Sequence, residues 1–344
     1  MKIASLFAGA GGLDLGFEQA VFKLTWANEH DSKIWATFKH NFPDVTLDQR
    51  DIRDVPSNDI PNDIVGVVGG PPCQSWSEAG AQRGIDDDRG KLFYQYIRVL
   101  RDKQPLFFLA ENVQGMLFKR NEQALHNILE QFDRAGYTVQ YTLLNTVDYG
   151  VPQDRKRVIF VGYHKDLNLE FEFPAPHLEK MTLRDAIGDL TESAQPAMQK
   201  NHSNGDMLSI PNHEYMIGGH SSMFMSRNRV RTWDEPSFTI QAGGRHAPIH
   251  PQASVMIKVD KDVFEFDPSS PKPYRRLSVR EAARIQTFPD DFIFQYQRVA
   301  DGYKMVGNAV PVTFAYHLAT QIYADLEAIA LTHDNQKPIL NEAI

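Results

Sequence analysis

Short apolar runs alternate with segments of helical periodicity through the first half of the chain. The apolar runs are rich in β-branched and aromatic residues, and they predict strands at 2–8, 23–29, 63–70, 105–112, 139–145 and 158–164. Apolar residues at helical spacing between them predict helices at 32–42, 91–103 and 122–136. Strands and helices in turn indicate βαβ units, and near-continuous apolar strands are typical of a parallel sheet covered on both faces. The predicted fold class is α/β, with an open, doubly wound and mostly parallel sheet.

The pattern changes after about residue 175. The following segments are rich in Pro, Gly, Asn, His and Ser and contain only short strand-like pieces. Helical periodicity returns at 278–288 and at 310–331, where a long amphipathic helix is expected to pack back on the first sheet. We therefore predict a larger domain from 1–175 with 305–344, and a smaller loop-rich domain with a hinge at 176–304.

Composition narrows the class of protein. The 344 residues contain one cysteine, which excludes a disulfide within the chain and a cysteine-rich metal site, so we expect no metal. No apolar run approaches the roughly 18 residues of a membrane helix, and the first residues do not resemble a signal peptide. We expect a cytoplasmic protein with no membrane contact.

Charge gives a mixed indication about nucleic acid. The net charge of −8, taken alone, argues against such a partner, because phosphate neutralisation dominates its binding. Between Lys272 and Arg284, however, five basic residues face a single acid, Glu281. This run would allow a basic face on an acidic body.

A glycine-rich turn, LFAGAGGLDLGF, follows the first predicted strand. Gly9 and Gly11 have no Cβ, so a ligand can approach the backbone closely. The dinucleotide fingerprint G-x-G-x-x-G starting at Gly9 fails at its last position, which is Asp14. Glu29 ends the next strand, at about the 20-residue distance at which an acid meets ribose hydroxyls, and Asp51 ends the one after. The pattern predicts an adenosine pocket; the alternative is a structural turn whose acids cap helices.

The single thiol lies in the stretch VGGPPCQSWS, which can be neither a helix nor a regular strand. Cys73 follows a predicted buried strand, so it lies at the edge of the sheet where open α/β folds bind ligands. Most single cysteines are buried and inert, but a rigid Gly-Pro loop presents its next residue. Glu111 ends another strand at this edge, and Arg155 and Arg157 flank a strand entrance at a spacing that points both to one face. Together these residues predict a reactive thiol with charged partners.

Six short motifs resemble those of the DNA cytosine-C5 methyltransferases, in the same order and over most of the chain. They are FAGAGG, PPCQ, ENV, QDRKR, RRLSVREAARIQTFP and GYKMVGNAVP. The resemblance implies a Rossmann-like methyltransferase domain and S-adenosylmethionine as cofactor. The second domain then corresponds to the family's target-recognition domain.

The resemblance also implies how the cofactor is held. Phe7 would stack on its adenine, Glu29 would bind its ribose, and Asn308 and Val310 would close its methionine end. The implied cofactor contacts are Phe7, Gly9, Gly11, Glu29, Asp51, Ile52, Pro71, Leu92, Asn308 and Val310. The residue after Glu29 is often Trp in the family and is His30 here, so the packing beside the adenine differs.

For catalysis, the resemblance implies that the Cys73 thiolate attacks C6 of a cytosine flipped out of the duplex. Glu111 would hydrogen-bond N3 and Arg157 would bind O2, while Arg155 would support the loop and Glu111. Flipping the base costs a few kcal/mol, roughly, and is needed because C6 is reached from the face of the ring. The segment 77–91 would close over it as a lid, or else be an ordinary surface loop.

The loop-rich segment at about 176–276 looks close to the GGCC-specific modification enzymes of the HaeIII type. This likeness implies a bacterial restriction-modification enzyme that acts as a monomer on the inner cytosine of GGCC in duplex DNA. A cognate endonuclease would cut the same site without needing to bind the protein. The predicted DNA contacts are Gln74, Ser77, Arg227, Arg229 and Arg245. The spacing of SRNRVR would, in a strand, aim its three arginines to one side.

Three other functions compete with this interpretation. An exocyclic-amino methyltransferase shares the cofactor fold but needs neither Cys73 nor the arginine pair. A tRNA cytosine-C5 methyltransferase would have related motifs. A catalytically silent DNA-binding regulator would not need every reactive position to be filled, as it is here.

Overall fold

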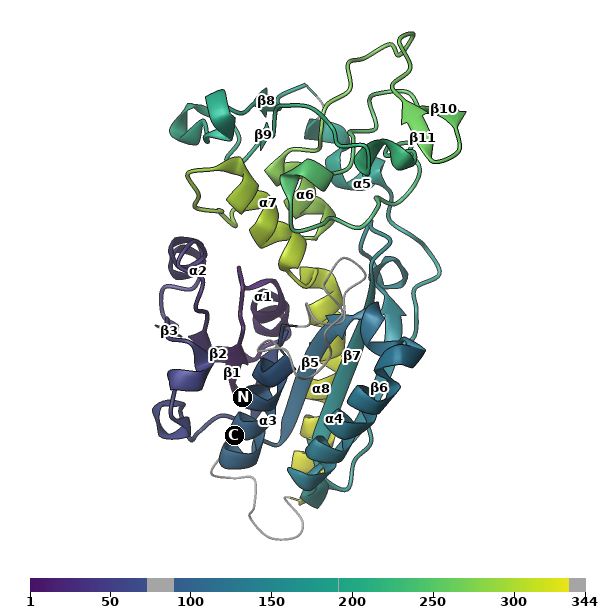
Figure 1. The fold of residues 1–344 in the computed structure, drawn as a ribbon. Coiled ribbons are helices and arrows are strands. Elements are labelled where there is room, and N and C mark those ends of the chain that lie inside the picture. The colour runs from purple at the N-terminus through teal and green to yellow at the C-terminus, as the bar shows by residue number, and fades with distance from the viewer. Residues whose placement is uncertain (73–89, 191, 334–344) are drawn as a thin grey trace.

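The computed structural model describes residues 1–72, 90–190 and 192–333. Figure 1 shows a lower part built on a sheet with helices, and an upper part made mainly of loops and short elements. None of the described helices is long and apolar enough to cross a membrane.

A seven-stranded sheet forms the centre of the larger part, in the order β3-β2-β1-β4-β5-β7-β6. Its strands are β1 (Lys2–Leu6), β2 (Lys23–Asn28), β3 (Thr46–Asp48), β4 (Gly66–Gly69), β5 (Phe107–Val113), β6 (Tyr137–Asn145) and β7 (Lys156–His164). β1 to β5 pair in parallel, whereas β7 is antiparallel to both β5 and β6. The strand order reverses between β1 and β4, and ligands of open α/β sheets bind at the carboxyl ends of such strands. The predicted α/β fold with a mostly parallel sheet is confirmed.

Helices cover both faces of this sheet. They are α1 (Gly12–Gln19), α2 (Trp35–Asn41), α3 (Gly90–Lys103), α4 (Glu122–Arg134) and α8 (Val312–His333). Along β5, Phe107 and Leu109 belong to a buried cluster with α1 and α8, whereas Phe108 and Ala110 belong to a second cluster with α3 and α4. This alternation is the two-residue period of a strand buried on both faces. The long carboxy-terminal helix packs on the first sheet as predicted (Figure 1).

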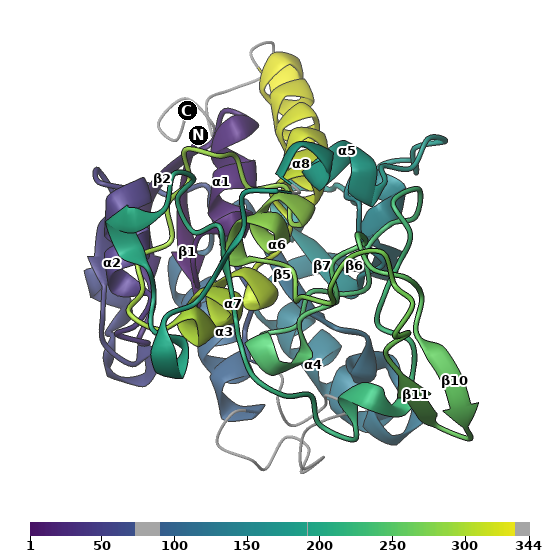
Figure 2. The same cartoon turned by 90° about the horizontal axis from the view of Figure 1, so that it is seen from above.

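The upper part contains little regular structure. Its elements are α5 (Leu183–Ile187), β8 (Gln195–Pro196), β9 (Glu214–Tyr215), β10 (Ile257–Asp260), β11 (Val263–Glu265), α6 (Val279–Ile285) and α7 (Val299–Asn308). α6 begins at a capping box, in which Ser278 and Glu281 each accept the other's backbone N–H. Seen from above, α6 and α7 lie over the middle of the molecule and the β10–β11 hairpin projects at its rim (Figure 2).

α7 contacts both parts. Lys304 Nζ lies 2.6 Å from Asp31 Oδ2 in the loop after β2, and the Tyr303 hydroxyl donates to the Leu277 carbonyl in the upper part. The boundary predicted between residues 304 and 305 therefore lies inside a helix that both parts share. The division into two domains stays a prediction.

Candidate active site

The turn after β1 has an unusual backbone that brings it to the open edge of the sheet. Phe7, Gly9 and Gly11 have φ angles of 56°, 57° and 94°, and this left-handed region is costly for a phenylalanine. A Cβ at Gly11 would lie 2.2 Å from the Phe42 ring, whereas a Cβ at Gly9 would meet no atom within 4 Å. Gly11 is thus required for packing, and the backbone at Gly9 borders open space.

Glu29 closes one side of this space. Its Oε2 accepts the Gly9 N–H at 3.0 Å, and its Oε1 accepts the Asp31 N–H at 2.7 Å. Burial raises the pKa of Glu29, while the two backbone donors oppose that rise. The side chain of the neighbouring His30 is 70% exposed, with Nδ1 3.9 Å from Glu29 Oε1. Each carboxylate oxygen retains a lone pair that can accept a hydroxyl proton.

Asp51 combines a structural role with the predicted one. It lies three residues after the end of β3 and caps the short 3₁₀ helix Ile52–Asp54, accepting the Arg53 N–H at 2.9 Å. The Arg53 guanidinium also pairs with the Asp51 carboxylate, at 2.7 Å, and this lowers the pKa of Asp51 to about 2. Ile52 is buried in the second hydrophobic cluster, against which Leu92 packs. Adenine contacts by these residues stay a prediction.

The segment 307–310, about 300 residues later in the chain, packs on the same turn. A Cβ at Gly12 would lie 2.4 Å from the Val310 carbonyl oxygen. Asn308 is exposed at the end of α7, and Val310 is buried. The structure therefore brings Ala309 and Val310 next to the glycine turn, and the cofactor contacts of Asn308 and Val310 stay a prediction.

Arg155 is buried among backbone carbonyls. The side chain is 1% exposed, and it donates to the carbonyls of Ile240 at 3.0 Å, Gly307 at 3.0 Å and Ala309 at 3.1 Å. Burial lowers its pKa, and the nearby Arg157 lowers it further. No hydrogen bond between Arg155 and Glu111 is present, although the charge of Glu111 partly opposes the fall in the pKa of Arg155, and the expected support of the loop and Glu111 by Arg155 stays a prediction. The side chain fixes the two carbonyls that flank Asn308.

Two buried glutamines extend this support, and the sequence analysis did not select them. Gln153 Nε2 donates to Gln286 Oε1 at 2.6 Å, and Gln286 Nε2 donates to the Val306 and Ala309 carbonyls at 2.8 and 3.1 Å. Both residues are fully buried. Their only signal in the sequence is that they lie within or beside the motifs QDRKR and RIQTFP.

Glu111 and Arg157 meet at the ends of adjacent antiparallel strands. Arg157 Nε lies 2.7 Å from Glu111 Oε1, with the two side chains 15% and 12% exposed. Arg157 Nη1 donates to the Lys156 carbonyl at 2.7 Å, and its Nη2 has no partner within the described residues. The pair therefore retains a free donor and a free carboxylate oxygen at the edge of the sheet.

The chain leading to the thiol is fastened beside this pair. Asn112 Nδ2 donates to the Pro71 carbonyl at 3.3 Å, and a Cβ at Gly70 would lie 3.4 Å from Glu111 Oε2. Pro71 is buried. Cys73, Gln74 and the part of the expected lid at 77–89, which includes Ser77, lie outside the described residues.

The three arginines of SRNRVR do not share a face. Residues 227–231 form only an isolated bridge at Val230 and no strand, so their period of two does not aim the three arginines to one side. Arg227 is exposed and has no side-chain hydrogen bond or ion pair within the described chain. Arg229 is buried and donates to the Phe224 and Met223 carbonyls at 2.7 and 2.9 Å. Arg231 pairs with Glu235 and Asp154.

The basic run at 272–284 does not form the basic face that its composition allowed. Arg275 pairs with the buried Glu281 at 2.7 Å, and Arg284 pairs with Asp189 and Asp290 at 2.6 and 2.7 Å. Arg280 is fully buried and donates to backbone carbonyls. These charges are used to hold the upper part together. Arg245, by contrast, is exposed and lines a pocket of about 860 Å³ in the upper part.

Comparison with solved structures identifies the class of the fold. A putative DNA modification methyltransferase encoded within a prophage of E. coli matches with a TM-score of 0.72 at 24% identity, covering 95% of this chain and 99% of that chain. A DNMT2 mutant of Spodoptera frugiperda matches with a TM-score of 0.67 at 17% identity, covering 94% and 99%. The protein has the Rossmann-like fold of the methyltransferases.

Comparison of sequences identifies the family. Residues 1–324 match the family described as C-5 cytosine-specific DNA methylase. The chain is 60% identical to the Type II methyltransferase M.MthTI of Methanothermobacter thermautotrophicus, over 96% of this chain and 99% of that protein. It is 54% identical to M.NgoPII of Neisseria gonorrhoeae, over 95% and 96%. The chain therefore belongs to the C-5 cytosine-specific DNA methylase family and is a DNA (cytosine-5)-methyltransferase. The resemblance implied by its motifs is confirmed.

Proposed function

We propose that this methyltransferase modifies the inner cytosine of GGCC in duplex DNA, through a covalent bond between Cys73 and a flipped base. The observation that carries the covalent part is the Glu111–Arg157 pair, 2.7 Å apart. Asn112, the residue after Glu111, donates a hydrogen bond to the carbonyl of Pro71, and this places the pair beside the chain two residues before Cys73. A nucleophile presented beside two charged groups with free hydrogen-bonding positions is what addition to a cytosine ring requires.

S-adenosylmethionine fits the space in front of Gly9. A Cβ there would meet no atom within 4 Å, and the Glu29 carboxylate borders it with an acceptor left on each oxygen. Glu29 would hold the ribose, Asp51 and Ile52 would meet the adenine edge, and Asn308 would close the methionine end. When bound, this cofactor supplies an electrophilic methyl group.

The chain's own residues supply the remaining chemistry. The Cys73 thiolate forms a bond to C6, which makes C5 nucleophilic. Arg157 Nη2 donates to O2, and a proton held between the Glu111 carboxylate and N3 neutralises the negative charge that the addition places on the ring. After methylation, C5 loses its proton to water and the C6–sulfur bond breaks, which restores the aromatic ring and the thiolate. Glu111 and Arg157 are fixed by β5 and β7 before the base arrives, so little reorganisation is needed at the moment of reaction.

Recognition of GGCC would come from the upper part. Arginine makes two hydrogen bonds to guanine O6 and N7, worth about 1–3 kcal/mol of discrimination for each good pair. Arg227 and Arg245 are exposed and free to reach bases. Arg229 remains a predicted reader, but its present contacts give it a positioning role first. We infer a monomer that acts in the bacterial cytoplasm, alongside an endonuclease that cuts the same site.

A trapping experiment tests the covalent mechanism. A GGCC duplex with 5-fluorocytosine at the inner position should form a denaturation-resistant complex with the wild type, because fluorine cannot leave as a proton does. Cys73→Ser should form none, yet bind S-adenosylmethionine nearly as tightly. A complex with Cys73→Ser, or none with the wild type, would contradict the mechanism. Methyl transfer to tRNA but not to duplex DNA would instead support a tRNA cytosine-C5 methyltransferase.

A further inference from the structure

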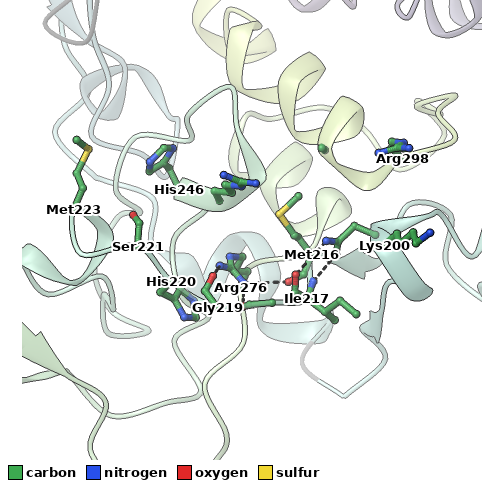
Figure 3. Close-up of a pocket in the computed structure, with 14 residues that line it drawn as sticks. Lys200, Met216, Ile217, Gly219, His220, Ser221, Met223, His246, Arg276 and Arg298 are labelled. Atoms are coloured by element: carbon green, nitrogen blue, oxygen red, sulfur yellow. Dashed lines mark hydrogen bonds between the residues drawn. The ribbon is translucent and has the colours of Figure 1, made fainter.

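A pocket of about 860 Å³ opens between separate segments of the upper part (Figure 3). One wall is the backbone of residues 216–221, and the others come from Lys200, Arg245 with His246, and the start of α7 at Arg298. Figure 3 shows Lys200 and Arg298 on the same side of the pocket, with His246 on the opposite side. The pocket thus has a basic end built from two separate parts of the sequence.

The charge of this lining is opposite to that of the whole protein. The chain has a net charge of −8, with 44 acidic and 36 basic residues. The lining residues include Lys200, Arg245, Arg276 and Arg298 and no carboxylate. Lys200, Arg245 and Arg298 are exposed, and none of them has a side-chain hydrogen bond or ion pair within the part of the chain that the structure describes. A cluster of unpaired cations in a concave site attracts an anionic ligand.

The wall of the pocket formed by residues 216–219 is fixed by a buried arginine. Arg276 is 4% exposed and donates to the carbonyls of Met216, Gly218 and Gly219 at 3.3, 3.0 and 2.8 Å. A Cβ at Gly218 or Gly219 would meet nothing within 4 Å, so a ligand can approach this backbone. Gly218 also has a φ of 114°, which disfavours any other residue. Arg276 is a positioning residue, because its guanidinium donates to backbone carbonyls of the protein and not into the pocket.

The start of α7 adds to the basic end. This helix has ten residues, and Arg298 at its N-cap makes no side-chain cap hydrogen bond. The first N–H groups of a helix lack partners within it and favour an anion. Phosphate groups match both features, since they accept hydrogen bonds from backbone N–H groups and are neutralised by lysine and arginine.

We infer that Lys200 and Arg298 bind the sugar-phosphate backbone of the target duplex and so set its register for base reading by Arg245 on the same pocket. The inference rests on the proposed function only in taking duplex DNA as the ligand, and it does not depend on GGCC. A phosphate contact carries no sequence information, so its loss weakens binding to every duplex alike.

The test replaces each cation by a neutral side chain of similar length, Lys200→Gln and Arg298→Gln. The binding affinity of each variant is measured for a duplex that contains the recognition site of the enzyme and for a duplex that lacks it, over a series of salt concentrations. Each variant should bind both duplexes roughly five- to tenfold more weakly at about 0.1 M salt, and the slope of log K against log salt should fall by about 0.9. Lys23→Gln is the matched control: Lys23 is exposed and unpaired within the described residues but lies at the amino end of β2, away from the pocket.

Each outcome decides the inference. Equal losses on both duplexes with a lower salt slope, and no change in Lys23→Gln, support it. A loss confined to the cognate duplex makes these residues base readers and overturns it, as does an effect no larger than that of Lys23→Gln. If the wild type methylates a site other than GGCC, the same measurements on that site still test the phosphate contacts. Failure of the proposed GGCC specificity is therefore distinguishable from failure of the phosphate contacts of Lys200 and Arg298.

Discussion

Replacing Arg155 by methionine separates a positioning role from a catalytic one. Arg155 is 1% exposed and makes hydrogen bonds of 3.0, 3.0 and 3.1 Å to three backbone carbonyls. Methionine has a similar length and apolar stem but no donor. The substitution therefore leaves the carbonyls of Ile240, Gly307 and Ala309 without a hydrogen-bond donor, while the methionine side chain fills much of the volume that the arginine occupied.

The size of the effect follows from these contacts. Leaving a buried acceptor unsatisfied costs roughly 1–3 kcal/mol, so three of them cost about 3–9 kcal/mol. Removing a buried guanidinium recovers part of this, because desolvation disfavours its charge. We expect a net fall in the free energy of unfolding of about 3–5 kcal/mol, comparable to breaking a buried pair. For 344 residues, with an unfolding entropy of about 2.1 cal/mol/K per residue, the melting temperature should fall by roughly 4–7 °C.

The assay combines thermal unfolding with steady-state kinetics. Because Gly307 and Ala309 flank Asn308, Arg155→Met should raise the KM for S-adenosylmethionine more than it lowers kcat. Arg184→Met is the matched control, since Arg184 pairs with Asp234 on the surface and such exposed pairs add little to stability. A collapse of kcat with an unchanged melting temperature and unchanged KM would refute the reasoning and place Arg155 at the reacting base.

Four further substitutions test other parts of the molecule. Glu29→Ala should weaken S-adenosylmethionine binding more than DNA binding in titrations, and equal loss of both would mean that Glu29 is only a structural cap. Burial raises the pKa of Asp14 from 3.8 to about 7, so the wild type loses stability as the pH rises from about 4 through 7. Asp14→Asn should remove this loss and gain roughly 4 kcal/mol in urea unfolding at about pH 8.5, with little gain near pH 4; a gain independent of pH would contradict the burial argument. Arg227→Gln should reduce the affinity for GGCC duplex at an unchanged melting temperature. Arg229→Gln should also lower the melting temperature, because it leaves the Met223 and Phe224 carbonyls without their hydrogen-bond donor. A lower melting temperature for Arg227→Gln and an unchanged one for Arg229→Gln would exchange their roles.

The sheet could be predicted from the sequence because its strands are buried on both faces. Apolar runs such as the one ending at Glu111 must be covered by helices on each side, and this leaves few arrangements. The same logic placed Glu29, Glu111 and the start of the thiol loop at one edge, since the carboxyl ends of parallel strands meet there. Local pattern was sufficient for these features.

The remaining features depend on partners that are distant in the sequence. Arg155 is fixed by carbonyls 85 to 154 positions away, and no local pattern indicates such a partner. In the loop-rich part, Arg227, Arg229 and Arg231 have a period of two but no strand, because Arg229 is drawn to its own turn and Arg231 to acids elsewhere. The run at 272–284 looks basic in the sequence, yet its charges pair internally. The free cations are scattered, so only the folded chain brings Lys200 and Arg298 together.

The central claim is that this enzyme converts the inner cytosine of GGCC to 5-methylcytosine. The most direct measurement is a base-resolution map of 5-methylcytosine in the DNA of a host that expresses the protein, with Cys73→Ser expressed in parallel. We predict full methylation of the inner cytosine at GGCC on both strands with the wild type, and none with Cys73→Ser. Methylation at another sequence with GGCC unmodified would contradict the proposed specificity, and methylation by Cys73→Ser would contradict the covalent mechanism.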